Sequence, residues 1–166
     1  MIINVKSLHD ANKLIFNIGD EYLSNWISIR DKDYPEIYNI IDTNCKNICK
    51  LEFDDITYYQ EKHDLLYSFY DEIKLHRELI HFNEEHAKQI IEFAKNVFNK
   101  NEVLNIHCYA GRSRSQAIGY VLNQYFNLYL TNNIDDFLKN IQNNNSKFMG
   151  NPDVIKLLNK CLFCEG

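Results

Sequence analysis

The chain has 166 residues, of which 45% are hydrophobic and 25% are charged, and these values are typical of one globular domain with one core. Its net charge of −5 disfavours a general binder of nucleic acids or membrane surfaces. The sequence lacks a run of about 18 uncharged apolar residues, and its first residues lack the features of a signal peptide. We therefore expect a single soluble domain over residues 1–166, located in the cytoplasm.

Short apolar runs alternate with helical patterns along the chain. Four runs are too short and too apolar for surface helices, so we expect strands over residues 2–5, 26–29, 48–53 and 103–106. Residues 58–80 are predicted to form a helical excursion over the surface. Further helices are predicted over residues 83–100, 115–126 and 133–141 and from Pro152 onward. The Asn-rich residues 142–146 are predicted to form a loop.

Strands that alternate with helices predict a mainly parallel α/β sheet, here of four to five strands, with helices on both faces. The clearest helix is the one over residues 83–100. Asn83 can cap it, and Glu84 and Glu85 suit the positive end of its dipole. Its apolar stripe consists of Ala87, Ile90, Ile91, Ala94, Val97 and Phe98. This stripe is expected to pack against the sheet.

Residues 107–115 read HCYAGRSRS and lie between the last predicted strand and a predicted helix. A loop at the carboxyl end of a parallel strand directs backbone N–H groups into one concavity, where the dipole of the following helix favours an anion. Gly111 permits a tight turn in this loop. Arg114 follows Cys108 by six positions. The pattern predicts an anion-binding loop that contains a cysteine and an arginine.

These two residue types suit phosphoryl transfer. A thiol pKa of about 8.5 falls to about 3.5–7.5 beside a helix N-terminus and cations, so we expect Cys108 to be a thiolate nucleophile. The planar guanidinium of Arg114 can bind two phosphoryl oxygens and place the phosphorus over the sulfur. The Ser115 hydroxyl can donate to the sulfur and ease its departure. The alternative, a core cysteine and a solvated arginine, leaves two basic residues at a helix end that disfavours them.

HCYAGRSRS resembles the signature loop of the protein tyrosine phosphatase superfamily, and its Ser-Arg-Ser ending is most similar to the dual-specificity branch. LEFDDI, NEEHAKQIIEFAKN and NPDVIKLLN resemble segments of small bacterial and phage tyrosine-phosphatase-like proteins, so that the similarity extends over residues 51–158. The earlier residues resemble them only loosely, through NWISIRD. The resemblance implies a phosphate-binding loop between a central strand and a helix. Its phosphate-binding residues would be Tyr109, Ala110, Gly111, Arg112, Ser113 and Arg114.

Expulsion of an alkoxide-like leaving group requires a proton from a general acid. The family supplies an Asp from a loop after the strand that precedes the signature strand, and Asp55 occupies the matching position. The interval of 53 positions from Asp55 to Cys108 is longer than is usual in the superfamily, because residues 58–80 look inserted. Asp54, Asp71 and, more weakly, Asp64 therefore remain alternatives. Each of them could also be a turn residue or a helix cap.

Other polar residues give weaker signals. His107 could donate to a backbone carbonyl and support the thiol, or it could fill space beside the strand. His86 is expected to pack or to support the site indirectly. The five cysteines are an odd number and are predicted to be thiols, and the spacings Cys45-x3-Cys49 and Cys161-x2-Cys164 lack the turn residues of zinc sites. We predict no metal and no cofactor.

The leading hypothesis is a phosphomonoesterase that acts through a phosphocysteine on phosphorylated proteins or peptides, with phosphotyrosine preferred over phosphoserine and phosphothreonine. A second hypothesis keeps this chemistry but changes the substrate to an inositol phosphate, a phosphoinositide or an RNA 5′-phosphate, because Arg112 adds a second cation. A third is a catalytically weak relative that only binds phosphate. The sequence does not predict the oligomeric state.

Overall fold

The strands form one parallel sheet at the centre of the protein. The computed structural model describes residues 1–17, 25–45, 47–98, 103–144 and 147–164. The strands of the described residues are β1 (Ile2–Ser7), β2 (Asn25–Arg30), β3 (Ile48–Glu52) and β4 (Val103–Cys108). They lie in the order β1-β4-β2-β3, and every pairing is parallel. The predicted α/β fold with a mainly parallel sheet is therefore confirmed.

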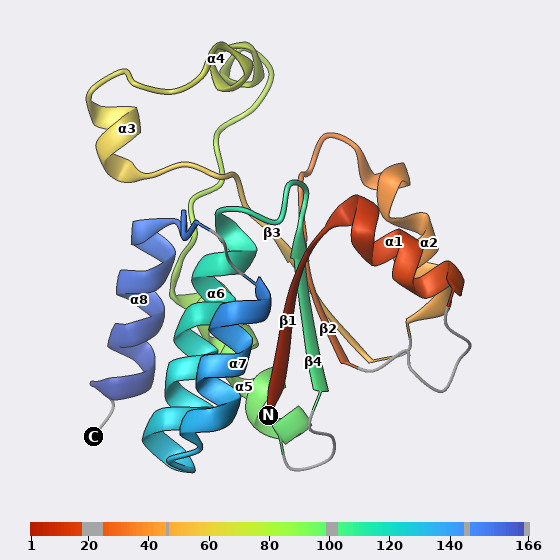
Figure 1. Ribbon diagram of the computed structural model, residues 1–166. Coiled ribbons are helices and arrows are strands. Elements are labelled where there is room, and N and C mark those ends of the chain that lie inside the picture. Colours follow the sequence, from red (N-terminus) through yellow and green to blue (C-terminus); the bar gives the residue numbers. More distant parts are fainter. Residues whose placement is uncertain (18–24, 46, 99–102, 145–146, 165–166) are drawn as a thin grey trace.

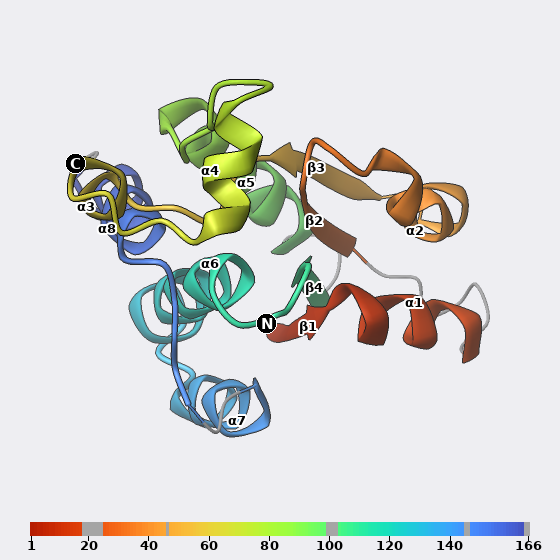
Figure 2. The same cartoon turned by 90° about the horizontal axis from the view of Figure 1, so that it is seen from above.

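Helices cover both faces of this sheet (Figures 1 and 2). On one face lie α1 (Leu8–Asn17) and α2 (Asn39–Asn44), together with the 3₁₀ turn η2 (Pro35–Tyr38). On the other lie α5 (Glu84–Phe98) and α6 (Arg114–Asn123), and α8 (Pro152–Phe163) packs against both of them. α7 (Ile134–Asn144) lies against β1 at the edge of the sheet. None of the described helices is long and apolar enough to cross a bilayer.

The alternation of side chains along β2 explains why the sheet has two separate cores. Trp26 packs with Leu8, Ala11 and other residues of α1 and α2 in the smaller core. Ile27 and Ile29 point to the opposite face and belong to the larger core, which α5, α6 and α8 complete. Both faces of β2 are buried, as the continuous apolar run predicts.

One predicted loop is wrong. α7 continues to Asn144, so residues 142–144 are helical, and residues 145–146 lie outside the described part of the chain. The Asn144 side chain donates to the carbonyl oxygen of Ile3 at 2.7 Å and accepts from the N–H of Val5 at 2.9 Å. It thereby satisfies backbone groups at the exposed edge of β1, and this tertiary contact stabilises the last turn of α7. The predicted helix over residues 83–100 ends at Phe98, and residues 99–100 lie outside the described part.

The excursion over residues 58–80 contains two short helices, α3 (Tyr58–Lys62) and α4 (Ser68–Lys74). Both lie at the end of the molecule toward which the strands point with their carboxyl ends, and α3 lies over the start of α8 (Figures 1 and 2). β4, the central strand that ends at Cys108, leads directly into the HCYAGRSRS loop and then into α6. The excursion and this loop therefore share one end of the molecule. After α6 the chain continues as the π-helical segment η3 (Gln124–Leu130).

Candidate active site

The loop between β4 and α6 wraps around the sulfur of Cys108. The N–H of Gly111 donates to Sγ at 3.2 Å, and Ser115 Oγ lies 3.1 Å from Sγ. Gly111 has φ of +69°, and a Cβ at this position would lie 2.6 Å from the backbone nitrogen of Ser7. The loop is therefore held against the end of β1 in a shape that requires glycine at position 111.

Arg114 begins α6, and its guanidinium is buried. Nη1 donates to Asp31 Oδ1 at 2.9 Å and to the carbonyl oxygen of Phe53 at 2.8 Å. Burial opposes the charge, but the electrostatic effects of Asp31 and Cys108 outweigh it and raise the pKa of Arg114 above its usual value. Nε is buried and has no hydrogen-bond partner among the described residues. A buried cationic donor without a partner fits an anionic ligand at this loop.

His107 lies beneath the loop in a chain of buried polar contacts. Its Nε2 is 2.7 Å from Ser28 Oγ, and its Nδ1 is 3.3 Å from the carbonyl oxygen of Cys108. Ser28 Oγ also accepts from Arg30 Nε at 3.1 Å, and Arg30 pairs with Asp42. Burial lowers the pKa of His107 to about 4. The ring is therefore neutral at pH 7, and it both fills space and bonds to the backbone of the loop.

Asp55 faces the loop from the turn after β3. Its Oδ1 accepts from Ser113 Oγ at 2.7 Å and from Asn151 Nδ2 at 3.0 Å. The backbone N–H of Asp55 donates to the Tyr70 hydroxyl at 3.0 Å. Asn151 also caps α8 through its Oδ1. The signature loop, α4 and the start of α8 thus hold Asp55 in place.

The other predicted candidates for the acid lie elsewhere. Asp71 is exposed on α4, and Asp64 is exposed after α3 with φ of +55°. Asp54 is buried and bonds to Arg77 through both carboxylate oxygens. Among these four carboxylates, Asp55 is the one that lines the cavity over Cys108.

This cavity has a volume of about 580 Å³, which suits a small-molecule group or a side chain. Of the predicted phosphate-binding residues, Gly111 is the one that does not line it. Arg112 is exposed and lines it, so a second cation is present at its rim. Its aromatic lining consists of Tyr34, Phe69, Tyr70 and Tyr109. The excursion, through Phe69 and Tyr70, therefore forms one wall of the cavity.

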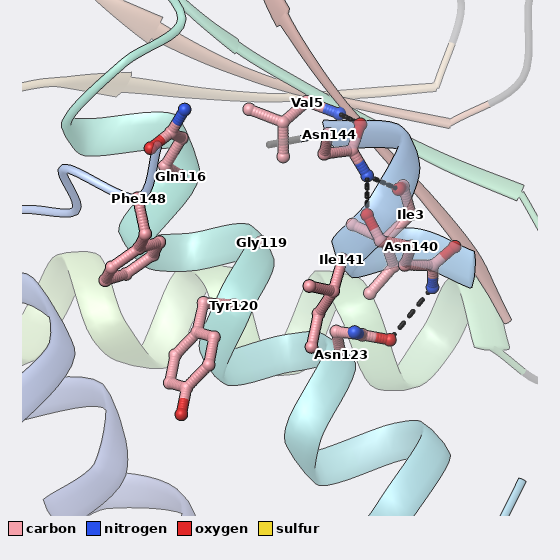
Figure 3. Close-up of a pocket in the computed structure, with 10 residues that line it drawn as sticks. All are labelled: Ile3, Val5, Gln116, Gly119, Tyr120, Asn123, Asn140, Ile141, Asn144 and Phe148. Atoms are coloured by element: carbon pink, nitrogen blue, oxygen red, sulfur yellow. Dashed lines mark hydrogen bonds between the residues drawn. The ribbon is translucent and has the colours of Figure 1, made fainter. Parts of the chain in front are cut away.

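A second, smaller cavity of about 120 Å³ lies between β1, α6 and α7 (Figure 3). Its polar lining is largely amide. Asn140 donates to Asn123 Oδ1 at 2.8 Å, and Asn144 bonds to the edge of β1. These amides hold α7 against β1 and α6, so the polar part of this cavity has a structural explanation.

Several residues that the sequence singled out lie outside the active-site cavity. His86 packs on Phe53, with ring centroids 5.4 Å apart, and burial lowers the pKa of His86. All five cysteines lie within the described residues, and none of them forms a disulfide. Burial raises the pKa of Cys45 and of Cys49 to about 11, so both thiols are protonated at pH 7. The described residues contain no group of three or more metal-ligating side chains that could hold an ion.

Comparisons with known proteins support the fold. No family model matches the chain, and no curated protein is a significant match to its sequence. Its fold is similar to that of Tk-PTP, a protein tyrosine phosphatase whose crystal structure was solved in the active form. The match covers 96% of this chain and 90% of the other, with a TM-score of 0.55 and 10% sequence identity. At this identity, the likeness shows a shared fold.

Sequence reasoning did not single out three residues of the site. Asp31 pairs with Arg114, Asn151 donates to the Asp55 carboxylate, and the Tyr70 hydroxyl accepts the N–H of Asp55. A signal for Asp31 was present, because this carboxylate lies two residues after the strand predicted over residues 26–29, at the end of the sheet where the loop also lies. The additional contacts of Asn151 and Tyr70 are made between distant segments, and no local pattern indicates them.

Proposed function

We propose that this protein is a phosphomonoester hydrolase of the protein tyrosine phosphatase type that acts through a phosphocysteine on Cys108. The observation that carries the proposal is the buried Nε of Arg114, which has no partner among the described residues and lies in the loop that surrounds the cysteine sulfur. The Asp55 carboxylate lines the same cavity. Nucleophile, anion-binding group and acid are thus brought together, as phosphoryl transfer requires.

In the first step the Cys108 thiolate attacks phosphorus, so that the S–P bond forms and the ester O–P bond breaks. Arg114 and the loop N–H groups balance the charge on the non-bridging oxygens. Protonated Asp55 gives its proton to the leaving oxygen, which departs as a neutral alcohol or phenol. Before substrate binds, the hydrogen bonds from Ser113 and Asn151 keep the Asp55 carboxylate at the cavity wall.

In the second step water attacks the phosphocysteine. Asp55 accepts a proton from that water, the S–P bond breaks, and inorganic phosphate and the thiolate are released. The sulfur is a better leaving group when a hydrogen bond stabilises its negative charge. The Ser115 hydroxyl, 3.1 Å from Sγ, and the N–H of Gly111, 3.2 Å from it, can supply this stabilisation.

We propose phosphotyrosine in a protein or peptide as the preferred substrate. The cavity walls include the exposed rings of Tyr34 and Phe69, against which an aryl group can pack. The position of Arg112 at the rim supports a second candidate, in which the substrate is an inositol phosphate, a phosphoinositide or an RNA 5′-phosphate.

Hydrolysis of p-nitrophenyl phosphate and of a phosphotyrosine peptide, with chelator and reductant present, tests the proposal. Cys108→Ser and Arg114→Ala should abolish both activities. Asp55→Asn should lose about 10²–10⁴-fold in kcat on the peptide and much less on p-nitrophenyl phosphate, whose leaving group needs little protonation. Asp71→Asn is the matched control and should behave as wild type.

A wild-type protein that is silent on both substrates would contradict the protein-phosphatase proposal. Inositol phosphates and RNA 5′-ends would then be tested with the same variants. Silence on these substrates as well would leave a phosphate-binding role, measured as binding of inorganic phosphate that Arg114→Ala abolishes.

A further inference from the structure

The excursion that carries α3 and α4 is closed at its base beside the candidate active site. The backbone N–H of Asp54 donates to the carbonyl oxygen of Ile80 at 2.8 Å. The N–H of Ile80 donates in return to Asp54 Oδ2 at 2.7 Å. The chain therefore leaves the sheet after Asp54 and returns next to it, and Asp55 lies in the short turn that leads into the excursion.

Arg77 stabilises the point where the two ends of the excursion meet, because its guanidinium binds two carboxylates. Nη1 and Nη2 donate to the two oxygens of Asp54, each at 2.9 Å. Nε and Nη2 donate to the two oxygens of Asp33 at 2.9 and 2.7 Å. These hydrogen bonds to Asp54 and Asp33 raise the pKa of Arg77. Because Asp54 is only 3% exposed, Arg77 supplies the opposite charge that its carboxylate needs inside the protein.

The two carboxylates that Arg77 binds belong to the two turns that supply the site. Asp54 directly precedes Asp55, the proposed general acid. Asp33 lies two residues after Asp31, which orients the buried guanidinium at the start of α6. One side chain of the excursion therefore joins the turn after β2 to the turn after β3.

A second contact ties the excursion to the acid. Tyr70 and Ile73 of the excursion pack with Ile56, which precedes it, in a small apolar cluster. The Tyr70 hydroxyl also accepts the N–H of Asp55 at 3.0 Å. The excursion is thus a packed wall that contacts the backbone of Asp55. Arg77 joins the excursion to the turns after β2 and β3, because it binds Asp33 in the first and Asp54 in the second.

We propose that Arg77 is a positioning residue that holds Asp55 over the oxygen of the leaving group. The proposal rests on the proposed function, since it assigns a task to the general acid of that reaction. If Arg77 served only to stabilise the fold, its replacement would lower the amount of folded protein and thereby reduce the activity on all substrates by the same factor. Displacement of Asp55 instead harms substrates whose leaving group must be protonated.

The test compares Arg77→Gln and Asp33→Asn with wild type on a phosphotyrosine peptide and on p-nitrophenyl phosphate. Arg77→Gln removes both bidentate pairs, whereas Asp33→Asn weakens one pair and leaves the Asp54 pair intact. Lys160→Gln, which removes the exposed ion pair with Glu84 between α8 and α5, is the control. Folded protein is quantified for every variant by near-ultraviolet circular dichroism.

For Arg77→Gln we expect kcat on the peptide to fall about tenfold or more, while kcat on p-nitrophenyl phosphate falls less than about threefold. Asp33→Asn should also lower the ratio of kcat on the peptide to kcat on p-nitrophenyl phosphate, but by a smaller factor. Lys160→Gln should leave this ratio unchanged. Equal losses on both substrates, or no loss, would overturn the proposal.

Failure of the proposed function gives a different result, because wild type itself is then silent on both substrates. Amide hydrogen exchange then decides whether Arg77 positions these turns. The proposal expects the amides of Asp54, Asp55 and Ile80 to exchange at least about tenfold faster in Arg77→Gln than in wild type or Lys160→Gln. Unchanged exchange at these three amides would refute it.

Discussion

Arg114 carries its charge inside the protein because a carboxylate and a carbonyl oxygen compensate it. Asp31 Oδ1 and the carbonyl oxygen of Phe53 both accept from Nη1, at 2.9 and 2.8 Å. Asp31 is itself fixed by Tyr38, whose hydroxyl accepts the N–H of Asp31 at 2.8 Å. Burial raises the pKa of Tyr38 to about 12, so the phenol stays protonated. The guanidinium is therefore held in one orientation, and its Nε, which has no partner among the described residues, remains available for an anionic ligand such as the proposed phosphoryl group.

Replacement of Asp31 tests this arrangement at a single residue. In Asp31→Asn the buried guanidinium loses its compensating charge, so the free energy of unfolding should fall by about 1–3 kcal/mol. The orientation of Arg114 should also loosen, and the inhibition constant of inorganic phosphate should rise about tenfold. Chemical denaturation and competitive inhibition measure the two effects. Asp71→Asn, which alters an exposed carboxylate on α4, should change neither, and an unaltered phosphate affinity in Asp31→Asn would contradict this account.

At the scale of elements, the signature loop takes its shape from β1 as much as from α6. The N–H of Leu8 donates to the carbonyl oxygen of Tyr109 at 3.0 Å, just after β1 ends. The backbone of Lys6 and Ser7 lies so close to Gly111 that no side chain fits between them. Strand β1 therefore fixes the height of the loop above the sheet, and with it the direction of the N–H groups that would contact phosphate.

Gly111→Ala should disturb this contact between elements. The new Cβ would meet the backbone of Ser7 at 2.6 Å, and alanine is strained at φ of +69°. We expect stability to fall by more than about 1 kcal/mol and kcat/KM to fall by about 10²-fold or more. Gly150→Ala is the matched control, because its Cβ would mainly meet the ring of Phe148, which can rotate away. Equal activities of the two variants would show that the loop does not need its contact with β1.

At the scale of the whole molecule, the sequence predicted most reliably what is encoded locally. The buried strands are continuous apolar runs, and Cys108 and Arg114 belong to one short motif, so neighbouring residues were enough to locate them. α2 has only six residues, and only Ile40 and Ile41 join it to the smaller core, so its sequence is too short to show a helical period. The arrangement of Asp31, Asn151 and Arg77 depends on segments far apart in the chain, and only the folded structure shows it.

The two cores of the molecule lie on opposite faces of the sheet, and the His107 side chain of β4 points toward the smaller one. Its ring lies 6.2 Å from the ring of Trp26 and 6.2 Å from that of Tyr38, and the side chain is fully buried. A charge on this imidazole would have to exist within an apolar cluster next to Arg30 and Arg114. The smaller core can therefore keep His107 only in its neutral form, which links the stability of the whole protein to pH.

The sign of this linkage follows from the two pKa values. The pKa of His107 has its ordinary value of about 6.5 in the unfolded chain and falls to about 4 in the folded protein. As the pH falls through this window, the unfolded chain gains a proton that the folded protein does not, so stability is lost. The loss between pH 7 and pH 5 should be about 2 kcal/mol, and it should level off below about pH 4 for this residue.

Urea denaturation of wild type and His107→Gln at several pH values between 7 and 5 measures this loss. Glutamine can still donate to the carbonyl oxygen of Cys108 but does not titrate, so the variant should lose most of the slope although its stability at pH 7 is lower. Burial also lowers the pKa of His86, which contributes a smaller slope of the same sign that remains in the variant. His9→Gln alters an exposed residue of α1 and should keep the wild-type slope. If His107→Gln kept that slope as well, His107 would not be the group that links folding to pH.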